Sequence, residues 1–239
     1  MTLTYKTVLK IHFSGSVILV VGGWNDSSKR CNVSQLSSLT RSCSNLQNYP
    51  IAIRSATGAI VSGNPMICGG LSYGSKHSEC YQHNKAINSW KFVTNMTTER
   101  YFSASVPVNN KLLVLGGWDG KNDLATTEFV SPDGDPSQPG PDLPAPRSLH
   151  CAVTLSNGGV MLIGGEPDEK SVIIFHPNTN EFDQSLPPLI FERTHFGCAA
   201  FKSPLHDNRE VVVAAGGSGT ATAEVLDYSQ PNPAWTESN

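Results

Sequence analysis

Four arginines recur along the chain at nearly constant intervals and are its most regular candidates for chemistry. Arg54, Arg100, Arg147 and Arg193 are spaced 46, 47 and 46 residues apart. A guanidinium group presents a planar fork of N–H donors that fits a carboxylate with two parallel hydrogen bonds. The four side chains could therefore bind an acidic ligand, or each could pair with an acid or a carbonyl of the fold itself.

Three further polar side chains follow these arginines closely and would share any surface that the arginines line. Tyr101, His150 and His195 lie one to three residues beyond an arginine. The two histidines fall at similar positions in successive intervals, but neither belongs to a His-x-x-His or Cys-x-x-Cys pair, the spacing typical of zinc sites. We therefore expect a ligand-binding surface with no metal and no cofactor.

Catalysis by a nucleophile or on a phosphate has little support in the sequence. Residues 14–16 and 217–219 are typical of turns rather than of the strand-to-helix elbow that presents a nucleophilic serine. The glycine pairs described next do not open helices, so no phosphate-binding helix N-terminus is expected. We expect a binding protein rather than an enzyme.

Glycine pairs recur with nearly the same period as the arginines and define a repeat. Pairs that end apolar runs begin at Gly22, Gly69, Gly116, Gly164 and Gly216, at intervals of 47, 47, 48 and 52 residues. Around them the pattern is strand, turn, apolar strand, glycine pair, polar loop and alternating strand, with no helical period. A residue without Cβ can end a buried strand at positive φ and lets a neighbouring segment approach closely. The pattern predicts an all-β chain of repeated four-stranded units.

The repeat resembles that of the kelch family. The run 116–120 (Gly-Gly-Trp-Asp-Gly) is similar to a kelch glycine-pair motif, 81–90 is similar to a kelch third strand and its following Trp, and 175–182 and 226–235 look like weaker copies. Kelch blades have four strands and about 50 residues. The resemblance implies a kelch-type β-propeller of four-stranded antiparallel blades, in one domain over 1–239 with blades at roughly 1–50, 51–96, 97–143, 144–189 and 190–239.

The resemblance also implies a function. Kelch propellers commonly bind a protein or peptide partner through their loops and central pocket, and in kelch adaptors arginines at this place in the first strand hold acidic peptides. It leaves two alternatives open: a propeller enzyme, either galactose-oxidase-like or carbohydrate-active, and the substrate-receptor arm of a ubiquitin ligase if a BTB domain lies upstream. Because such propellers commonly have six or seven blades, we expect five repeats to form an incomplete ring or an unusually small one.

Composition limits the remaining partners. The chain has 17 Lys and Arg against 20 Asp and Glu, a net charge of −3, with no basic run, so neither nucleic acid nor an anionic membrane is expected as a partner. The apolar run 17–23 is too short to span a bilayer. We assign it to a strand rather than to a signal peptide because the same glycine-pair pattern recurs later in the chain.

Six cysteines allow disulfide bonds. Cys31 and Cys43, and likewise Cys68 and Cys80, are 12 residues apart and could bridge adjacent strands of a blade. The other two, at 151 and 198, are expected as small buried thiols in the first strands of successive blades.

Glycosylation sequons point to the same compartment as the cysteines. They begin at Asn25, Asn32 and Asn95, in expected loops or turns. Together the two features predict a disulfide-bonded, glycosylated, extracellular protein, with a cytoplasmic protein that keeps reduced thiols as the alternative.

Overall fold

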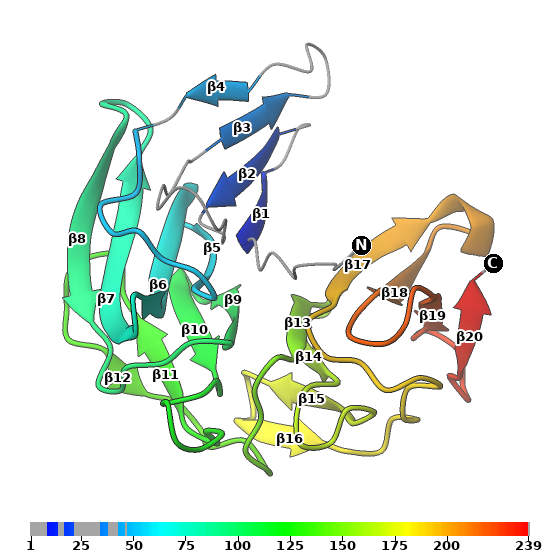
Figure 1. The fold of residues 1–239 in the computed structure, drawn as a ribbon. Coiled ribbons are helices and arrows are strands. Elements are labelled where there is room, and N and C mark those ends of the chain that lie inside the picture. The colour runs from blue at the N-terminus through cyan, green and yellow to red at the C-terminus, as the bar shows by residue number, and fades with distance from the viewer. Residues whose placement is uncertain (1–8, 14–16, 22–33, 38–42, 46, 239) are drawn as a thin grey trace. The chain divides into compact units, whose positions relative to one another are not determined.

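Five four-stranded antiparallel sheets follow one another along the chain (Figure 1). The computed structural model describes residues 9–13, 17–21, 34–37, 43–45 and 47–238, the first four of these ranges as backbone strands only. In every sheet the strands lie in chain order, so each strand pairs with the next one along the chain. This meander is the pattern of a kelch blade and confirms the predicted all-β, kelch-type fold class.

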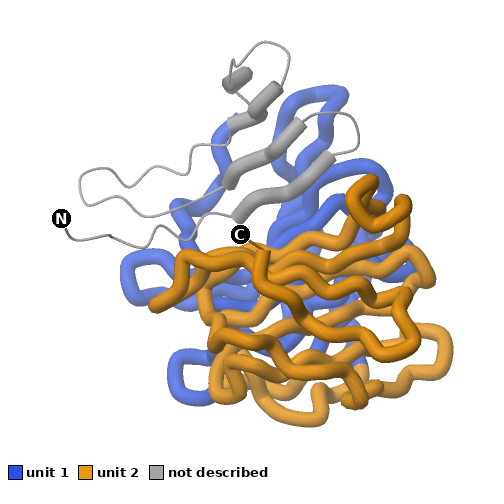
Figure 2. The backbone as a smooth tube through the Cα atoms, turned by 90° about the vertical axis from the view of Figure 1, so that its right-hand side faces the viewer, with its two compact units in different colours: residues 1–122, 127–140 blue, residues 123–126, 141–239 orange. Residues whose placement is uncertain are grey.

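The chain divides into two compact units, which Figure 2 colours separately. Unit 1 comprises residues 1–122 and 127–140, and unit 2 comprises residues 123–126 and 141–239. Each sheet falls within one of the five predicted blade ranges. That these ranges make one domain stays a prediction.

Unit 1 contains three of the sheets. Their strands are β1 (Leu9–Phe13), β2 (Val17–Val21), β3 (Ser34–Ser37), β4 (Cys43–Asn45); β5 (Thr57–Val61), β6 (Asn64–Ser72), β7 (Ser75–Asn84), β8 (Ser89–Asn95); and β9 (Ala104–Val108), β10 (Lys111–Leu115), β11 (Thr127–Val130), β12 (Gln138–Pro139). In β10 every side chain after Lys111 is buried. A strand covered on both faces is expected to be a continuous apolar run, as this one is.

Unit 2 contains the other two sheets. Their strands are β13 (Cys151–Thr154), β14 (Val160–Ile163), β15 (Val172–His176), β16 (Glu181–Asp183); and β17 (Gly197–Ser203), β18 (Arg209–Ala215), β19 (Ala223–Asp227), β20 (Trp235–Ser238). The extra residues predicted for the last repeat form the 3₁₀ turn η1 (Pro204–His206) between β17 and β18. One core cluster joins both sheets, from Val153 and Met161 to Val212 and Trp235.

In each of the four glycine pairs that the structure describes, at least one member lies too close to another segment for a side chain. Gly69 has a φ of +65°, and a Cβ added there would lie 2.4 Å from the carbonyl oxygen of Arg100. The next amide, Gly70 N–H, donates to that same carbonyl at 2.9 Å, and Gly165 N–H donates to Arg193 O at 3.0 Å. Each of these pairs therefore binds the arginine segment of the following repeat, which is one reason why the two markers keep the same period.

Two disulfides are present among the described residues. One joins Cys68 to Cys80 on adjacent strands β6 and β7, the pair that the sequence suggests. The other joins Cys151 to Cys198, and here the expectation of two separate thiols was wrong. The first strands β13 and β17 of successive sheets bring the two Cα atoms to 6.0 Å, within the range that a disulfide spans.

Several predicted modification sites lie outside the described residues. These are Asn25, Asn32, Cys31 and the side chain of Cys43, so their glycosylation and pairing stay predictions. Asn95, at the end of β8, is described and exposed. Within the described part of the chain, no helix has the length and apolar character needed to cross a bilayer.

Candidate functional site

Three of the four predicted arginines occupy one repeated position, a few residues before the first strand of a sheet. Arg100, Arg147 and Arg193 are all buried, with at most 5% of each residue exposed. In each repeat Nη1 donates to the carbonyl of the first glycine of the pair, at 2.9 Å to Gly116, 3.4 Å to Gly164 and 2.6 Å to Gly216. This recurring bond within one repeat is a second reason why the arginine and the glycine pair stay in phase.

Arg100 also pairs with an acid of its own sheet. Its Nη2 donates to Glu128 Oε1, on β11, at 2.6 Å. The same carboxylate accepts the backbone N–H groups of Thr97 at 2.6 Å and Thr98 at 3.2 Å. Burial alone would raise the pKa of Glu128, but these amides, Arg100 and the Ser137 hydroxyl outweigh burial and hold the pKa below its usual value. Glu128 is therefore an ionised carboxylate that binds the segment entering the sheet to its third strand.

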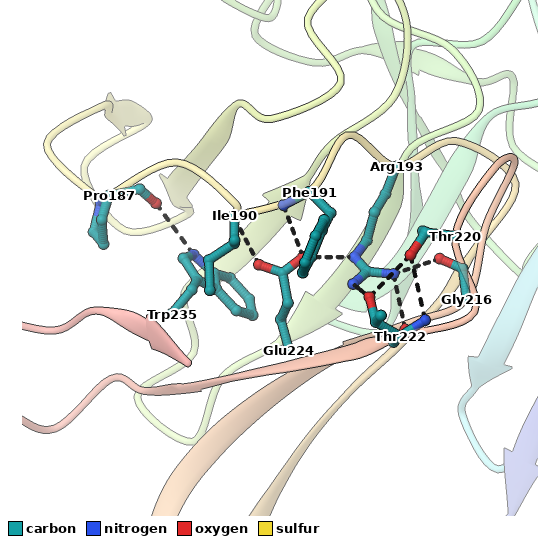
Figure 3. A network of polar contacts seen from close by, with 9 residues as sticks. All are labelled: Pro187, Ile190, Phe191, Arg193, Gly216, Thr220, Thr222, Glu224 and Trp235. Carbon is teal, nitrogen blue, oxygen red and sulfur yellow. Dashed lines mark hydrogen bonds and ion pairs between the residues drawn. The ribbon is translucent and has the colours of Figure 1, made fainter. Parts of the chain in front are cut away.

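Arg193 repeats this arrangement in the last sheet (Figure 3). Its Nε donates to Glu224 Oε1, on β19, at 2.8 Å, and both side chains are fully buried. Glu224 accepts the N–H groups of Ile190 at 2.6 Å and Phe191 at 3.3 Å. Those amides lie three and two residues before the arginine, as Thr97 and Thr98 do. The same arrangement of an arginine, a glutamate and two backbone amides thus occurs twice, once in each unit.

Arg147 has no corresponding acid. Glu128 pairs with Val114 in its sheet, and the register position equivalent to Glu128 in the next sheet is held by Ile173. Pro144 stands three residues before Arg147 and has no N–H, so one of the two backbone N–H donors of the neighbouring repeats is missing here. This repeat therefore lacks both the buried acid and one of the backbone donors that would bind it.

Several buried polar atoms at and near Arg147 have no hydrogen-bond partner among the described residues. Its Nη2 donates to Ser171 Oγ at 3.0 Å, and its pKa is lowered by burial against the opposing charge of Asp168. Close by, His150 is only 8% exposed, and neither of its ring nitrogens has a hydrogen-bond partner among the described residues. Burial and the charge of Arg147 lower the pKa of His150 to about 3. His150 is therefore a neutral imidazole at physiological pH.

Arg54 occupies a different position from the other three arginines. Left-handed residues mark one place in each of the last four repeats, with φ between 54° and 58° at Ser55, Phe102, Leu149 and His195. Counting back from Ser55 puts Ile53, which is buried, at the place of the buried arginines.

The bridges between isolated residues give the same alignment. Arg54 pairs with Leu71 as Tyr101 pairs with Trp118, each partner directly following a glycine pair. Arg54 is thus equivalent to Tyr101 and not to Arg100.

The structure brings two of the predicted site residues together in unit 1. Phe102 N–H donates to Ser55 O at 3.0 Å, so that the segments carrying Arg54 and Tyr101 lie side by side. Both Arg54 and Tyr101 are half-buried. The ring of Tyr101 lies against that of Phe102, with centroids 5.0 Å apart. Arg54 and Tyr101 therefore lie on neighbouring segments of unit 1.

Unit 2 contains the matching link between the two predicted histidines. His195 N–H donates to Leu149 O at 3.3 Å, which places the segments of His150 and His195 side by side. His195 is exposed, whereas His150 is buried, so only His195 presents its ring to solvent. Partial loss of solvent lowers the pKa of His195 against the opposing charge of Glu166.

Sequence reasoning missed the acidic partners Glu128 and Glu224. A usable signal was present, because Glu128 and Glu224 each stand at the second position of a third strand between apolar or Thr neighbours (Thr127–Val130 and Ala223–Asp227). Charged residues at buried strand positions are rarely tolerated without a partner. In the part of the chain that the structure describes, no group of three His, Cys, Asp or Glu residues could hold a metal ion.

Curated proteins with similar sequences include several kelch-repeat proteins. Spermatocyte protein spe-26 of Caenorhabditis elegans is 25% identical over 95% of this chain and 41% of its own length. Kelch repeat-containing protein kel-10 of the same organism is 30% identical over 44% of this chain and 19% of its own length. A kelch repeat and BTB domain-containing protein of C. elegans is 34% identical over 25% of this chain and 11% of its own length. No protein-family model matches the chain.

These similarities and the blade pattern define the class. The chain resembles kelch-repeat proteins in sequence, in repeat length and in its four-stranded antiparallel blades. It spans about two fifths of spe-26 and less of the other two relatives.

Proposed function

We propose that the chain is a binding scaffold for a protein or peptide partner, and that the neighbouring segments at Arg54 and Tyr101 of unit 1 contact that partner. The similarity to kelch-repeat proteins supports a role in protein interaction. The observation that carries the finer proposal is the alignment of the arginines. Three are buried, whereas Arg54 is half-buried, on a segment that lies beside that of Tyr101.

An acidic peptide is the ligand that this pair of side chains suits. The Arg54 guanidinium can meet a carboxylate with two parallel hydrogen bonds, and Tyr101 offers an apolar ring with a polar hydroxyl. Arginine and tyrosine are also the residue types that most often dominate binding energy at protein interfaces. In this proposal Arg100, Arg147 and Arg193 act as supports for the blades, and His195 lies on the matching segment of unit 2.

Peptide titrations test this proposal. Two pools of short peptides would be titrated by fluorescence polarisation, one rich in Asp and Glu and the other with Asn and Gln at the same positions. We expect the acidic pool to bind better and Arg54→Ala to weaken its binding at least about 10-fold, the value for one interaction of roughly 1.4 kcal/mol. Lys121→Ala removes an equal charge from an exposed residue and should have little effect. Equal binding of both pools would contradict the acidic-peptide proposal.

The compartment is a separate proposal, namely that the protein is secreted and glycosylated. The disulfides Cys68–Cys80 and Cys151–Cys198 and the exposed sequon at Asn95 support it. Intact mass of the protein from its own source, before and after reduction and deglycosylation, tests it. Free thiols and an unmodified mass would favour the cytoplasmic alternative, in which a BTB-linked substrate-receptor role would gain weight.

A further inference from the structure

Ser72, His77 and Glu79 form a continuous chain of hydrogen-bond contacts near the tip of the hairpin of β6 and β7. The Ser72 hydroxyl lies 2.6 Å from His77 Nε2, and His77 Nδ1 lies 3.1 Å from Glu79 Oε2. A serine, an imidazole and a carboxylate linked in this order can turn a hydroxyl into a nucleophile. We propose that this hairpin is an acyl-transfer site for small carboxylic esters, with Ser72 as the nucleophile.

The hairpin explains how the serine and the imidazole come together. Tyr73 and Gly74 both have positive φ, 44° and 83°, as expected of a two-residue turn between paired strands. Ser72 pairs with Ser75, so His77 is its diagonal neighbour on the facing strand. Directly opposite His77 stands Gly70, which has no side chain to crowd the imidazole.

A register shift between β6 and β7 places Glu79, the third residue of this chain of contacts. The strand pairing shifts between the Cys68–Cys80 and Gly70–His77 pairs, so β7 carries one extra residue where Glu79 lies. Bulges of this kind often redirect a side chain beside a functional site. The strand is held from the next segment as well, because Arg100 N–H donates to His77 O at 3.2 Å. The imidazole and the carboxylate are therefore fixed by the sheet rather than by a free loop.

The charges favour a basic nitrogen toward the serine. Burial would raise the pKa of Glu79, but hydrogen bonds from backbone amides and from His77 outweigh it and lower the pKa. An ionised Glu79 accepts Nδ1–H, and the tautomer with its proton on Nδ1 leaves the lone pair of Nε2 facing Ser72. In that tautomer the Ser72 hydroxyl donates to Nε2, which is the direction that general-base catalysis requires.

The reaction that this arrangement supports balances without any other reagent. Ser72 Oγ attacks the ester carbonyl as its proton passes to His77 Nε2; the Oγ–carbon bond forms, and the bond to the leaving alcohol breaks as that alcohol takes the proton. Water then attacks the acyl-serine with His77 as base, the Oγ–carbon bond breaks, and the proton returns to Ser72. Glu79 acts as a positioning residue that holds the ring and stabilises the imidazolium.

Ser72 lies next to an exposed turn, residues 73–75. Ser72 is half-buried, and the side chains of His77 and Glu79 are 14% and 35% exposed. A Cβ added to Gly74 would meet no atom within 4 Å. An ester could therefore approach the Ser72 hydroxyl from the side of the turn.

Hydrolysis of p-nitrophenyl acetate by the full chain tests the proposal. We expect Ser72→Ala to reduce kcat/KM by about 100-fold, the lower end of what general-base assistance contributes. Ser75→Ala is the matched control, because Ser75 faces Ser72 across the turn and no hydrogen bond joins it to the imidazole. A fluorophosphonate probe should add its mass to the peptide containing Ser72, and His77→Ala should abolish that labelling.

The role of Glu79 requires a readout that simple damage to the hairpin would not produce. Loss of its charge in Glu79→Gln should lower kcat and leave KM close to the wild-type value, because the imidazolium that Glu79 stabilises forms only during the reaction. Ester hydrolysis that survives Ser72→Ala but disappears in His77→Ala would identify His77 as the nucleophile and overturn the proposal. Turnover no faster than that of Ser72→Ala, with no probe adduct at Ser72, would also overturn it.

Discussion

Buried charge is the residue-scale feature that distinguishes this chain. Glu128 and Glu224 each receive an arginine and two backbone amides of the segment that enters the sheet. An ion pair this deeply buried is not in itself a source of great stability, because both charges lose their hydration. Removing one partner is costly, however, since the other remains buried and uncompensated.

Neutralising Glu128 should therefore destabilise the fold. At neutral pH we expect Glu128→Gln to lower the free energy of unfolding by about 3 kcal/mol, as measured by urea titration. The pKa of Glu128 is lowered in the fold, so its contribution is complete above the unfolded value of about 4.3 and is lost as the pH falls below it. The difference between the two proteins should accordingly shrink below about pH 4. Glu237→Gln, at an exposed residue, serves as the control.

His150 should make the protein sensitive to mild acid. Its folded pKa of about 3 lies below the unfolded value of about 6.5, so below pH 6.5 the unfolded chain takes up a proton that the fold excludes. Stability should then fall by up to about 1.4 kcal/mol per pH unit between roughly pH 6 and 4 from this group.

Replacement by an apolar side chain should remove that sensitivity. We expect His150→Leu to flatten the pH dependence of urea unfolding over this range, while His176→Leu, at a partly exposed histidine, leaves it in place. An identical slope in wild type and His150→Leu would show that the buried imidazole is not responsible.

At the scale of elements, the glycine pairs set how closely successive repeats approach. Gly69 and Gly63 both have positive φ, but only Gly69 lies against a neighbouring carbonyl, that of Arg100. We expect Gly69→Ala to cost at least about 2 kcal/mol more than Gly63→Ala, because backbone strain is common to both and the clash is confined to Gly69. Equal losses of stability in the two variants would mean that close approach does not constrain this position.

The blade pattern could be predicted from the sequence because it depends on local signals. Apolar runs, glycine pairs and turns recur in each repeat, and the extra residues of the last repeat fall in a loop between β17 and β18, as expected. The offset of Arg54 could not be predicted, because a period of 46 or 47 residues does not resolve a shift of one residue. That shift is visible only in the backbone, where Ser55 takes the left-handed conformation that Phe102 takes in the next repeat.

Pairings between residues far apart in the chain could likewise not be predicted from the sequence. The spacing of Cys68 and Cys80 suggests a bridge because both lie within one hairpin, whereas Cys151 and Cys198 meet only when two successive first strands lie side by side. The chain of contacts from Ser72 through His77 to Glu79 also depends on a register shift, which no residue pattern in the sequence indicates.

At the scale of the whole molecule, the arginines that support the blades differ from the residues proposed to contact a partner. Buried arginines bond to the glycine pairs and, in two repeats, to an acid of the third strand. Arg54 and Tyr101 in unit 1 are half-buried and His195 in unit 2 is exposed. The proposed function assigns contact with a partner to these side chains.

Binding of the acidic peptide pool to two variants of unit 1 tests this separation most directly. In Arg100→Met with Glu128→Gln the buried charges are removed together, and the glutamine oxygen can still accept the amides of Thr97 and Thr98. The account predicts that a folded protein carrying this double change binds the pool within about 3-fold of wild type, whereas Arg54→Ala binds at least about 10-fold more weakly. Loss of binding in the folded double variant, with binding retained in Arg54→Ala, would contradict it and identify the buried arginine as the ligand anchor.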